Sequence, residues 1–141
     1  TDKNMTRFLI SLEDGVNTVL FALANQIGGE IFVPKMPSCR VIDICEAINK
    51  NRKIEIIGIR PGEKLHEQMI GLEDAPYTYE YKDYFKILPS INDWSIDPER
   101  IKDGKKVDPN FNYSSDNNEE WMKISELRAW ISDNKNKIGK I

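Results

Sequence analysis

Two residues in the middle of the chain have the types and spacing needed to hold a phosphorylated ligand. Arg60 directly follows the β-branched stretch 54–59, and Glu63 comes three residues later. If 54–59 is a strand, Arg60 lies beyond its carboxyl end, where open α/β sheets bind ligands. A guanidinium group offers a planar fork to a phosphate, and a carboxylate can bind the hydroxyls of a ribose. An exposed turn in which Arg60 and Glu63 pair with each other explains the spacing equally well.

A second arginine could extend this site. Arg7 precedes the first predicted helix, and a lone arginine at such a place is usually a surface residue. Together with Arg60, however, it could clamp one diphosphate through directional hydrogen bonds. The loop 33–38 follows a predicted strand, so its backbone could receive a base edge or a phosphate, although most such loops are only connections.

No group of residues in the sequence indicates catalysis or a metal site. His66 is the single histidine and lies on a predicted helix, where we expect a solvated or capping role. Cys39 and Cys45 are six residues apart, and with one histidine they give no metal-ligand spacing. The segment 114–118 is expected to form a turn. We therefore expect no catalytic residue and no metal ligand.

Composition narrows the class of protein. The chain has 141 residues, of which 40% are hydrophobic, enough for one domain or a large piece of one. A net charge of −3 argues against nucleic-acid binding, which usually needs a strong basic excess. Two cysteines fit reduced thiols, and no apolar run approaches the length of a membrane span. A cytoplasmic protein with no membrane partner is expected, and the first residue, Thr1, suggests an excised segment.

The elements that must position Arg7 and Arg60 alternate between helix and strand, which predicts an α/β fold. Ser11 is expected to cap the first helix, which ends at Gly28-Gly29. The other predicted elements are a strand at 30–33, a loop at 34–40, a helix at 41–48, a buried strand at 54–59, a helix at 63–70, a hairpin at 77–88, an irregular segment at 92–118, a helix capped by Ser125, and a frayed tail at 135–141.

Four motifs, spread over most of the chain, occur in order: Met5-Thr6-Arg7-Phe8, Gly29 to Lys35, Ile57 to Glu67, and Tyr113 to Asn118. In this order they resemble the C-terminal half of the UDP-N-acetylglucosamine 4,6-dehydratase family of polysaccharide-biosynthesis proteins, which are extended short-chain dehydrogenase/reductases. The resemblance implies that residues 1–141 are the substrate-binding C-terminal domain of such an enzyme, without its Rossmann cofactor half.

The resemblance also implies roles for matched positions. In such enzymes two arginines, matched here by Arg7 and Arg60, contact the UDP diphosphate. The acidic residue matched by Glu63 binds the ribose hydroxyls. Lys35 lies in a loop near the nucleotide and is implied as a further substrate contact. The expected partners are thus a UDP-sugar, the missing N-terminal Rossmann half and, as a homo-oligomer, further copies of the protein.

The residues that perform the family's chemistry are absent from this sequence. It contains no G-x-G-x-x-G turn, and no tyrosine is followed four residues later by a lysine. The parent enzyme needs NADP or NAD, so this chain alone is expected to bind no cofactor and to be inactive. The alternatives are a UDP-sugar 4-epimerase of the same family, a stand-alone non-catalytic UDP-binding or regulatory module, and a structural domain whose motifs have lost their function.

Overall fold

The computed structural model describes residues 2–51, 53–91 and 97–135 and divides the chain into two compact units. Each unit gathers stretches that are far apart in the sequence. Unit 1 consists of Thr1–Leu9, Pro37–Glu67 and Ser114–Ile141, and unit 2 consists of Ile10–Met36 and Gln68–Tyr113. The mixture of helices and strands in both confirms the predicted α/β class.

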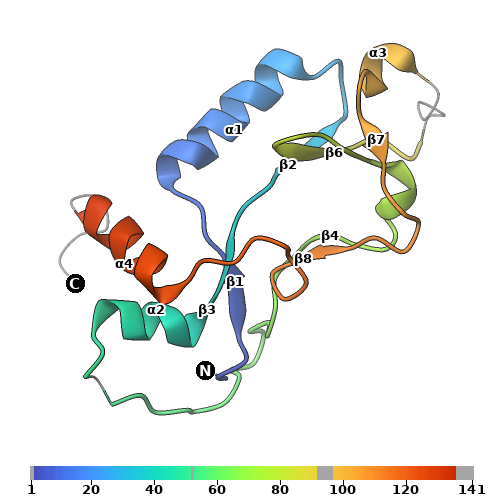
Figure 1. The fold of residues 1–141 in the computed structure, drawn as a ribbon. Coiled ribbons are helices and arrows are strands. Elements are labelled where there is room, and N and C mark those ends of the chain that lie inside the picture. Colours follow the sequence, from blue (N-terminus) through green and yellow to red (C-terminus); the bar gives the residue numbers. More distant parts are fainter. Residues whose placement is uncertain (1, 52, 92–96, 136–141) are drawn as a thin grey trace. The chain divides into compact units, whose positions relative to one another are not determined.

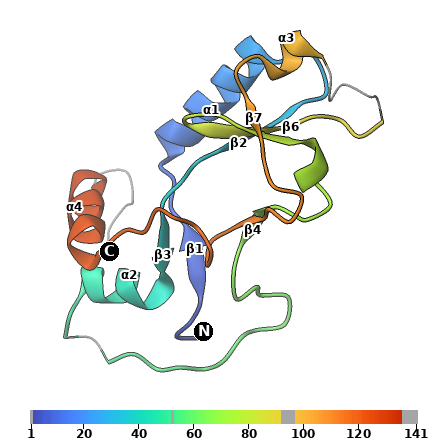
Figure 2. The same cartoon turned by 45° about the vertical axis from the view of Figure 1, so that its right-hand side comes forward.

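Unit 1 is built on a pair of short strands and a pair of helices. Strand β1 (Thr6–Phe8) runs antiparallel to β3 (Ser38–Arg40), with Arg7 opposite Cys39. Helix α2 (Val41–Ile48) follows β3 directly and packs against α4 (Ile124–Asp133), as Figures 1 and 2 show. The buried side chains of this unit include Met5, Cys39 and Leu127. Burial, and to a smaller extent the Asp43 carboxylate, raises the pKa of the Cys39 thiol.

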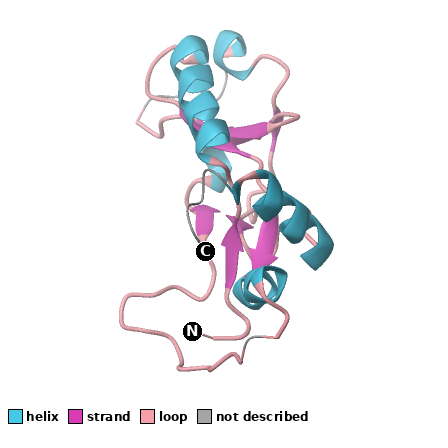
Figure 3. Cartoon of the chain, turned by 90° about the vertical axis from the view of Figure 1, so that its left-hand side faces the viewer, coloured by secondary structure: helices cyan, strands magenta, loops and turns pink. Residues whose placement is uncertain are grey.

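The predicted buried strand at 54–59 is wrong. The described residues between α2 and Glu67 form a long loop with no strand or helix, drawn in pink in Figure 3. The isoleucines of the stretch are exposed, from 44% for Ile54 to 60% for Ile57. A β-branched run forms a strand only where a neighbouring strand takes up its backbone hydrogen bonds. The described part of the chain brings no such neighbour to this stretch.

The predicted helix at 63–70 is also wrong. In a helix the carbonyls of Lys64 and Leu65 would accept hydrogen bonds from N–H groups four residues later. Here they accept from Arg7 instead, and the Leu65 carbonyl also accepts from the Thr6 N–H at 3.1 Å. The chain then enters strand β4 (Gln68–Ile70). Bonds from β1 have therefore replaced the local helical pattern.

Unit 2 contains a four-stranded sheet in the order β2-β6-β5-β7, whose pairings are antiparallel. The strands are β2 (Ile31–Pro34), β5 (Thr78–Glu80), β6 (Tyr84–Ile87) and β7 (Lys105–Lys106). The β5–β6 hairpin confirms the prediction at 77–88. Strand β2 includes Pro34, which a sheet tolerates at its edge. The predicted loop at 34–40 is thus shortened, because β3 already begins at Ser38.

Helix α1 (Leu12–Asn25) carries the cap that the sequence predicted. The Ser11 side chain accepts the Asp14 N–H at 3.0 Å, and the positive φ angles of Gly28 (146°) and Gly29 (81°) follow the end of the helix. Phe21 packs edge-on against Phe32 of β2, with the ring centroids 5.8 Å apart. None of the α1 residues is buried.

A lysine lies inside the sheet of unit 2. Lys86 is 5% exposed, and its ammonium group donates to the Arg100 carbonyl at 2.7 Å. The same nitrogen lies 5.4 Å from the ring centroid of Phe32 and 5.0 Å from that of Tyr81. Burial lowers the pKa of Lys86, while the Glu30 carboxylate partly opposes that shift.

The remaining elements are short. The described part of 92–118 is not wholly irregular, since it contains α3 (Pro98–Ile101), β7 and β8 (Tyr113–Ser114), and the 3-10 turn η1 (Ala75–Tyr77) precedes β5. The N-cap residue of α4 is Lys123 and not the predicted Ser125. The Glu126 carboxylate accepts the Lys123 N–H at 2.6 Å. The predicted frayed tail at 135–141 lies outside the described residues, except for Lys135.

Candidate functional site

The Arg7 guanidinium is turned toward the segment 64–67 of its own unit. Its Nη1 donates to the carbonyls of Thr6 at 2.6 Å and Leu65 at 3.2 Å, and its Nη2 donates to the Lys64 carbonyl at 3.0 Å. Its Nε lies 3.3 Å from the Glu67 carboxylate. Both terminal nitrogens of the guanidinium group thus donate to backbone carbonyls, and Nε adds an ion pair. Arg7 therefore holds the second half of the Arg60–Glu67 motif against β1.

A second set of contacts ties the same segment to the turn after β8. The Thr6 hydroxyl lies 2.8 Å from His66 Nδ1 and 2.6 Å from the Ser115 hydroxyl. Ser115 also accepts the Glu67 N–H at 2.9 Å. His66 is thus hydrogen-bonded through Nδ1, whereas the sequence predicted a solvated or capping role on a helix. Nothing in the sequence indicated that Thr6 and Ser115 are site residues, although both lie in the four motifs.

The other side of the His66 ring faces an acidic side chain. His66 Nε2 lies 3.9 Å from Asp116 Oδ2. The Ser114 hydroxyl donates to Asp116 Oδ1 at 2.6 Å, and this hydrogen bond is the main reason that the pKa of Asp116 is lowered. The segment 114–118 contains the turn that the sequence predicted, and this turn presents an ionised carboxylate to the imidazole ring.

Arg60 and Glu63 are joined through the backbone and not through an ion pair. The Glu63 N–H donates to the Arg60 carbonyl at 3.0 Å, and the Glu63 carboxylate accepts the Arg60 N–H at 3.1 Å. Among the ion pairs of the described residues, none involves Arg60. Gly62, at the tip of this turn, has a φ of 82°, which a residue with a Cβ adopts only with strain. The turn leaves the Arg60 residue exposed.

Lys35 belongs to unit 2, where it is engaged with its own sheet. Its ammonium group lies 2.7 Å from the Glu80 carboxylate and 5.0 Å from the ring centroid of Phe85. Its N–H donates to the Asp83 carbonyl at 3.0 Å. The structure thus brings Arg7 to the Arg60–Glu67 motif within unit 1, and it places Lys35 in the other unit.

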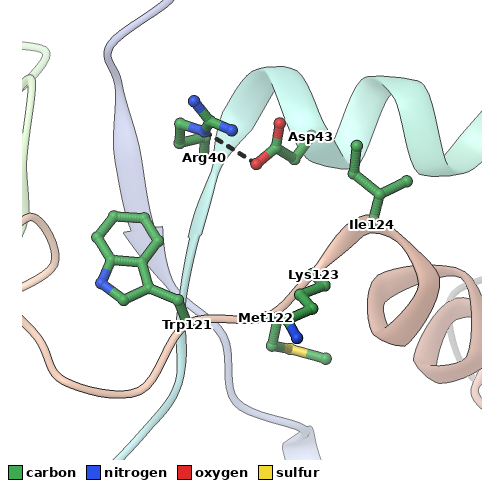
Figure 4. Close-up of a pocket in the computed structure, with 6 residues that line it drawn as sticks. All are labelled: Arg40, Asp43, Trp121, Met122, Lys123 and Ile124. Atoms are coloured by element: carbon green, nitrogen blue, oxygen red, sulfur yellow. Dashed lines mark hydrogen bonds and ion pairs between the residues drawn. The ribbon is translucent and has the colours of Figure 1, made fainter.

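Unit 1 also has a surface hollow of about 500 Å³ beside the start of α4 (Figure 4). Arg40 and Asp43 form an ion pair of 2.9 Å at its edge, and the indole of Trp121 is 40% exposed. The lining residues are Arg40, Asp43, Trp121, Met122, Lys123 and Ile124. The hollow is therefore lined by other residues than those that the sequence proposed for ligand binding.

The strand pairings of the described residues can be compared with those of a dinucleotide site. Rossmann-type sites are built from parallel strands with a glycine-rich turn before a helix. The pairings of β1 with β3, β2 with β6, and β5 with β6 and β7 are antiparallel. These four pairings of the described residues therefore do not form a Rossmann-type cofactor site. In the described ranges no three potential ligands gather as a metal site, and no helix there has the length and hydropathy to cross a bilayer.

Comparison with known proteins finds a matching family model and several relatives. A family model described as "polysaccharide biosynthesis protein" matches residues 1–89. A UDP-N-acetylglucosamine 4,6-dehydratase (inverting) from Campylobacter jejuni is 50% identical over 138 residues, which cover 94% of this chain and 41% of that protein. A UDP-glucose 4-epimerase from Rickettsia canadensis is 35% identical over 121 residues, covering 83% of this chain and 36% of the relative. The chain thus spans about two fifths of the dehydratase and somewhat less of the epimerase.

A solved structure resembles the fold as well. The X-ray structure of Pen from Bacillus thuringiensis superposes with a TM-score of 0.77 and 28% identity, over 96% of this chain and 39% of that one. The match confirms the predicted fold class: this chain has the α/β fold of one part of a larger protein. The resemblance that the four sequence motifs indicated is confirmed by the relatives.

Proposed function

We propose that this chain, which belongs to the polysaccharide biosynthesis protein family, is the substrate-binding portion of a UDP-N-acetylglucosamine 4,6-dehydratase. The support is the 50% identity to a relative of that name along nearly the whole chain. Because the chain spans 41% of that relative, the dehydratase activity belongs to the whole protein. We assign to this chain the binding of the nucleotide sugar and no catalytic step.

In this proposal the Arg60–Glu63 turn is the centre of the nucleotide site. The Arg60 guanidinium binds the diphosphate, because it is exposed and makes no ion pair within the described part of the chain. Glu63 uses one carboxylate oxygen to close the turn, which leaves the other for a ribose hydroxyl. The observation that carries the proposal is the grip of Arg7 on the Lys64 and Leu65 carbonyls, which holds the backbone next to the turn before a ligand arrives.

Arg7 and Lys35 are assigned lesser parts. Arg7 approaches the diphosphate with the N–H group that its protein contacts leave over, and Lys35 is a further substrate contact. Since both already make short polar contacts, each contributes less binding energy than Arg60. NADP or NAD is expected to bind in the part of the parent protein that precedes this chain, and we also expect a cytoplasmic homo-oligomer. The exposed apolar residues of α1 support such an assembly.

Calorimetric titration with UDP tests the proposed site. Arg60→Ala should weaken UDP binding by about 1.5–3 kcal/mol, the usual value for a lost hydrogen bond to a charged group. Lys53→Ala is the matched control, because it removes an exposed positive charge from the same loop and should leave the affinity unchanged. Equal UDP affinity for the Arg60→Ala variant and the unaltered chain would contradict the diphosphate role.

Titration with uridine separates the two halves of the turn. Uridine has a ribose but no phosphate, so Arg60→Ala should not change its affinity, whereas Glu63→Gln should weaken uridine and UDP alike. Glutamine retains a carbonyl oxygen that can still accept the Arg60 N–H, so the turn is preserved.

The alternative is a UDP-sugar 4-epimerase, which the 35% identical relative favours. The two activities share UDP and differ in their products. Incubating the full-length protein with UDP-N-acetylglucosamine and either NAD or NADP distinguishes them: a 4-keto-6-deoxy sugar supports the dehydratase, and a 4-epimer supports the alternative.

A further inference from the structure

A chain of hydrogen bonds with one favoured direction passes through the interior of unit 1. It begins at the Glu67 N–H, continues through the hydroxyls of Ser115 and Thr6, and ends at His66 Nδ1, with separations of 2.9, 2.6 and 2.8 Å. Ser115 is 0% exposed and Thr6 is 4% exposed. Buried hydroxyls of this kind need protein partners, because water cannot reach them.

The direction follows from counting donors. A backbone N–H can only donate, so Ser115 accepts from Glu67. Within the described residues the Thr6 oxygen is the other partner of the Ser115 hydroxyl, so the single Ser115 hydrogen points to Thr6. The Thr6 hydrogen then points to His66 Nδ1, which must accept it. The ring hydrogen is consequently on Nε2, on the side of the Asp116 carboxylate 3.9 Å away.

The reversed chain is unfavourable. If His66 Nδ1 carried a hydrogen, Thr6 would accept it and pass its own hydrogen to Ser115. Ser115 would then accept twice, from Thr6 and from Glu67, and its own hydrogen would be buried without an acceptor. Leaving a buried donor unsatisfied costs its full desolvation penalty. The geometry therefore selects the arrangement in which Nδ1 accepts from Thr6 and the ring hydrogen is on Nε2.

A catalytic use of these residues does not fit the geometry. Serine, histidine and aspartate occur together, but Thr6 stands between the Ser115 hydroxyl and the ring. Ser115 is completely buried, so a substrate cannot reach its oxygen. The arrangement can orient the backbone, and it offers no accessible nucleophile.

We propose that His66 is a positioning residue of the nucleotide site: its unprotonated Nδ1 ends an ordered chain of hydroxyls that locks the Arg60–Glu67 segment to β1 and to the turn after β8. The inference rests on the proposed function for its link to UDP, since the locked segment carries Arg60 and Glu63. Arg7 holds the same segment by its carbonyls, whereas the hydroxyl chain holds it by the Glu67 N–H and the His66 ring.

Nuclear magnetic resonance of the chain with 15N-labelled histidine tests the hydrogen position directly. Because His66 is the single histidine, its two ring nitrogens give unambiguous signals. We expect an unprotonated Nδ1 and a protonated Nε2 at neutral pH. A hydrogen on Nδ1 would overturn the proposal, whether or not the chain binds UDP.

Substitutions then test the link to the ligand. Thr6→Val and His66→Leu should each weaken UDP binding about fivefold, the effect of one neutral hydrogen bond, and should speed exchange of the Glu67 amide hydrogen. His66→Asn places a carbonyl oxygen near the position of Nδ1 and should restore affinity to within about twofold. Thr18→Val removes an exposed hydroxyl from α1 and serves as the control, with no expected change.

The outcomes separate the two proposals. Equal loss in His66→Asn and His66→Leu, or unchanged affinity and amide exchange in Thr6→Val, would overturn the positioning role. Absence of UDP binding by the unaltered chain would count against the proposed function, while the ring-nitrogen signals and the Glu67 exchange rate would still decide whether His66 positions the segment.

Discussion

The two halves of one continuous motif are held very differently. The carbonyls of residues 64 and 65 accept hydrogen bonds from the Arg7 guanidinium and the Thr6 N–H, and the Glu67 N–H donates to the Ser115 hydroxyl. The preceding stretch 54–63 has one closed turn at its end and otherwise exposed side chains. The anchored half is thus organised by residues some 50 positions away along the chain, whereas the open half depends on its own local turn.

This contrast suggests that the two halves have different roles in the proposed site. The open half carries Arg60 and Glu63, whose side chains have capacity left for a ligand, and the anchored half supplies the rigid base next to them. Ligand sites often combine mobile binding groups with a fixed scaffold. The contrast can be tested by removing the Arg7 contacts, by protonating Asp116 beside His66, and by replacing an exposed side chain of the open half.

Among changes that test the two halves of the motif, the largest effect is expected from Arg7→Met. This change keeps a long unbranched side chain but removes the guanidinium donors to the Thr6, Lys64 and Leu65 carbonyls. We expect a loss of about 2–3 kcal/mol in the free energy of unfolding, measured by urea denaturation. The segment 64–67 should also become more sensitive to limited proteolysis.

Arg7→Lys is the matched control, because one ammonium group keeps the charge but cannot span three carbonyls. It should recover only part of the stability. Full recovery would show that Arg7 acts through charge alone, and the contrast between the two halves would then need another explanation.

A smaller effect is expected from acid. The hydrogen bond from Ser114 lowers the pKa of Asp116 below its ordinary value of 3.8. A carboxyl whose pKa is lowered by folding contributes stability that is complete above the ordinary value and is lost as the pH falls through the folded-state pKa. The difference in unfolding free energy between the unaltered chain and Asp116→Asn should therefore shrink between about pH 5 and pH 2. A difference that stays constant over this range would contradict the assignment.

The smallest effect is expected in the open half. Ile56 is 52% exposed, so Ile56→Ser should change the free energy of unfolding by no more than about 0.5 kcal/mol. Ile70→Ala, at a position with 0% exposure, is the comparison and should cost about 2–5 kcal/mol. Thermal unfolding measured by circular dichroism can check both. A large loss for Ile56→Ser would mean that the stretch is packed in solution.

The sequence predicted the elements whose signals are local. The helical spacing and cap of α1, the apolar stripe of α2 and the aromatic hairpin at 77–88 needed no knowledge of distant residues. The strand at 54–59 and the helix at 63–70 failed because both depend on partners from elsewhere in the chain. A β-branched run needs a neighbouring strand, and Arg7 takes up carbonyls that a helix would have used.

The candidate site shows the same limit. The sequence proposed Arg60 and Glu63 as ligand groups and left their pairing open, and the structure shows the Arg60 N–H bonded to the Glu63 carboxylate. The contacts of Arg7 and the bonds among Thr6, His66 and Ser115 were beyond reach, because such contacts join residues up to 109 positions apart. The only sign of these contacts in the sequence was that all four residues lie in the four motifs.

The buried lysine of β6 has a consequence for how the hairpin finds its alignment. Neighbouring residues of a strand point to opposite faces, so sliding β6 by one position would exchange Lys86 for Phe85 or Ile87. The ammonium group would lose the Arg100 carbonyl and both aromatic rings. A misaligned pairing would therefore leave the Lys86 ammonium group without these partners. In this way one charged side chain helps to set the register of β6 in the sheet.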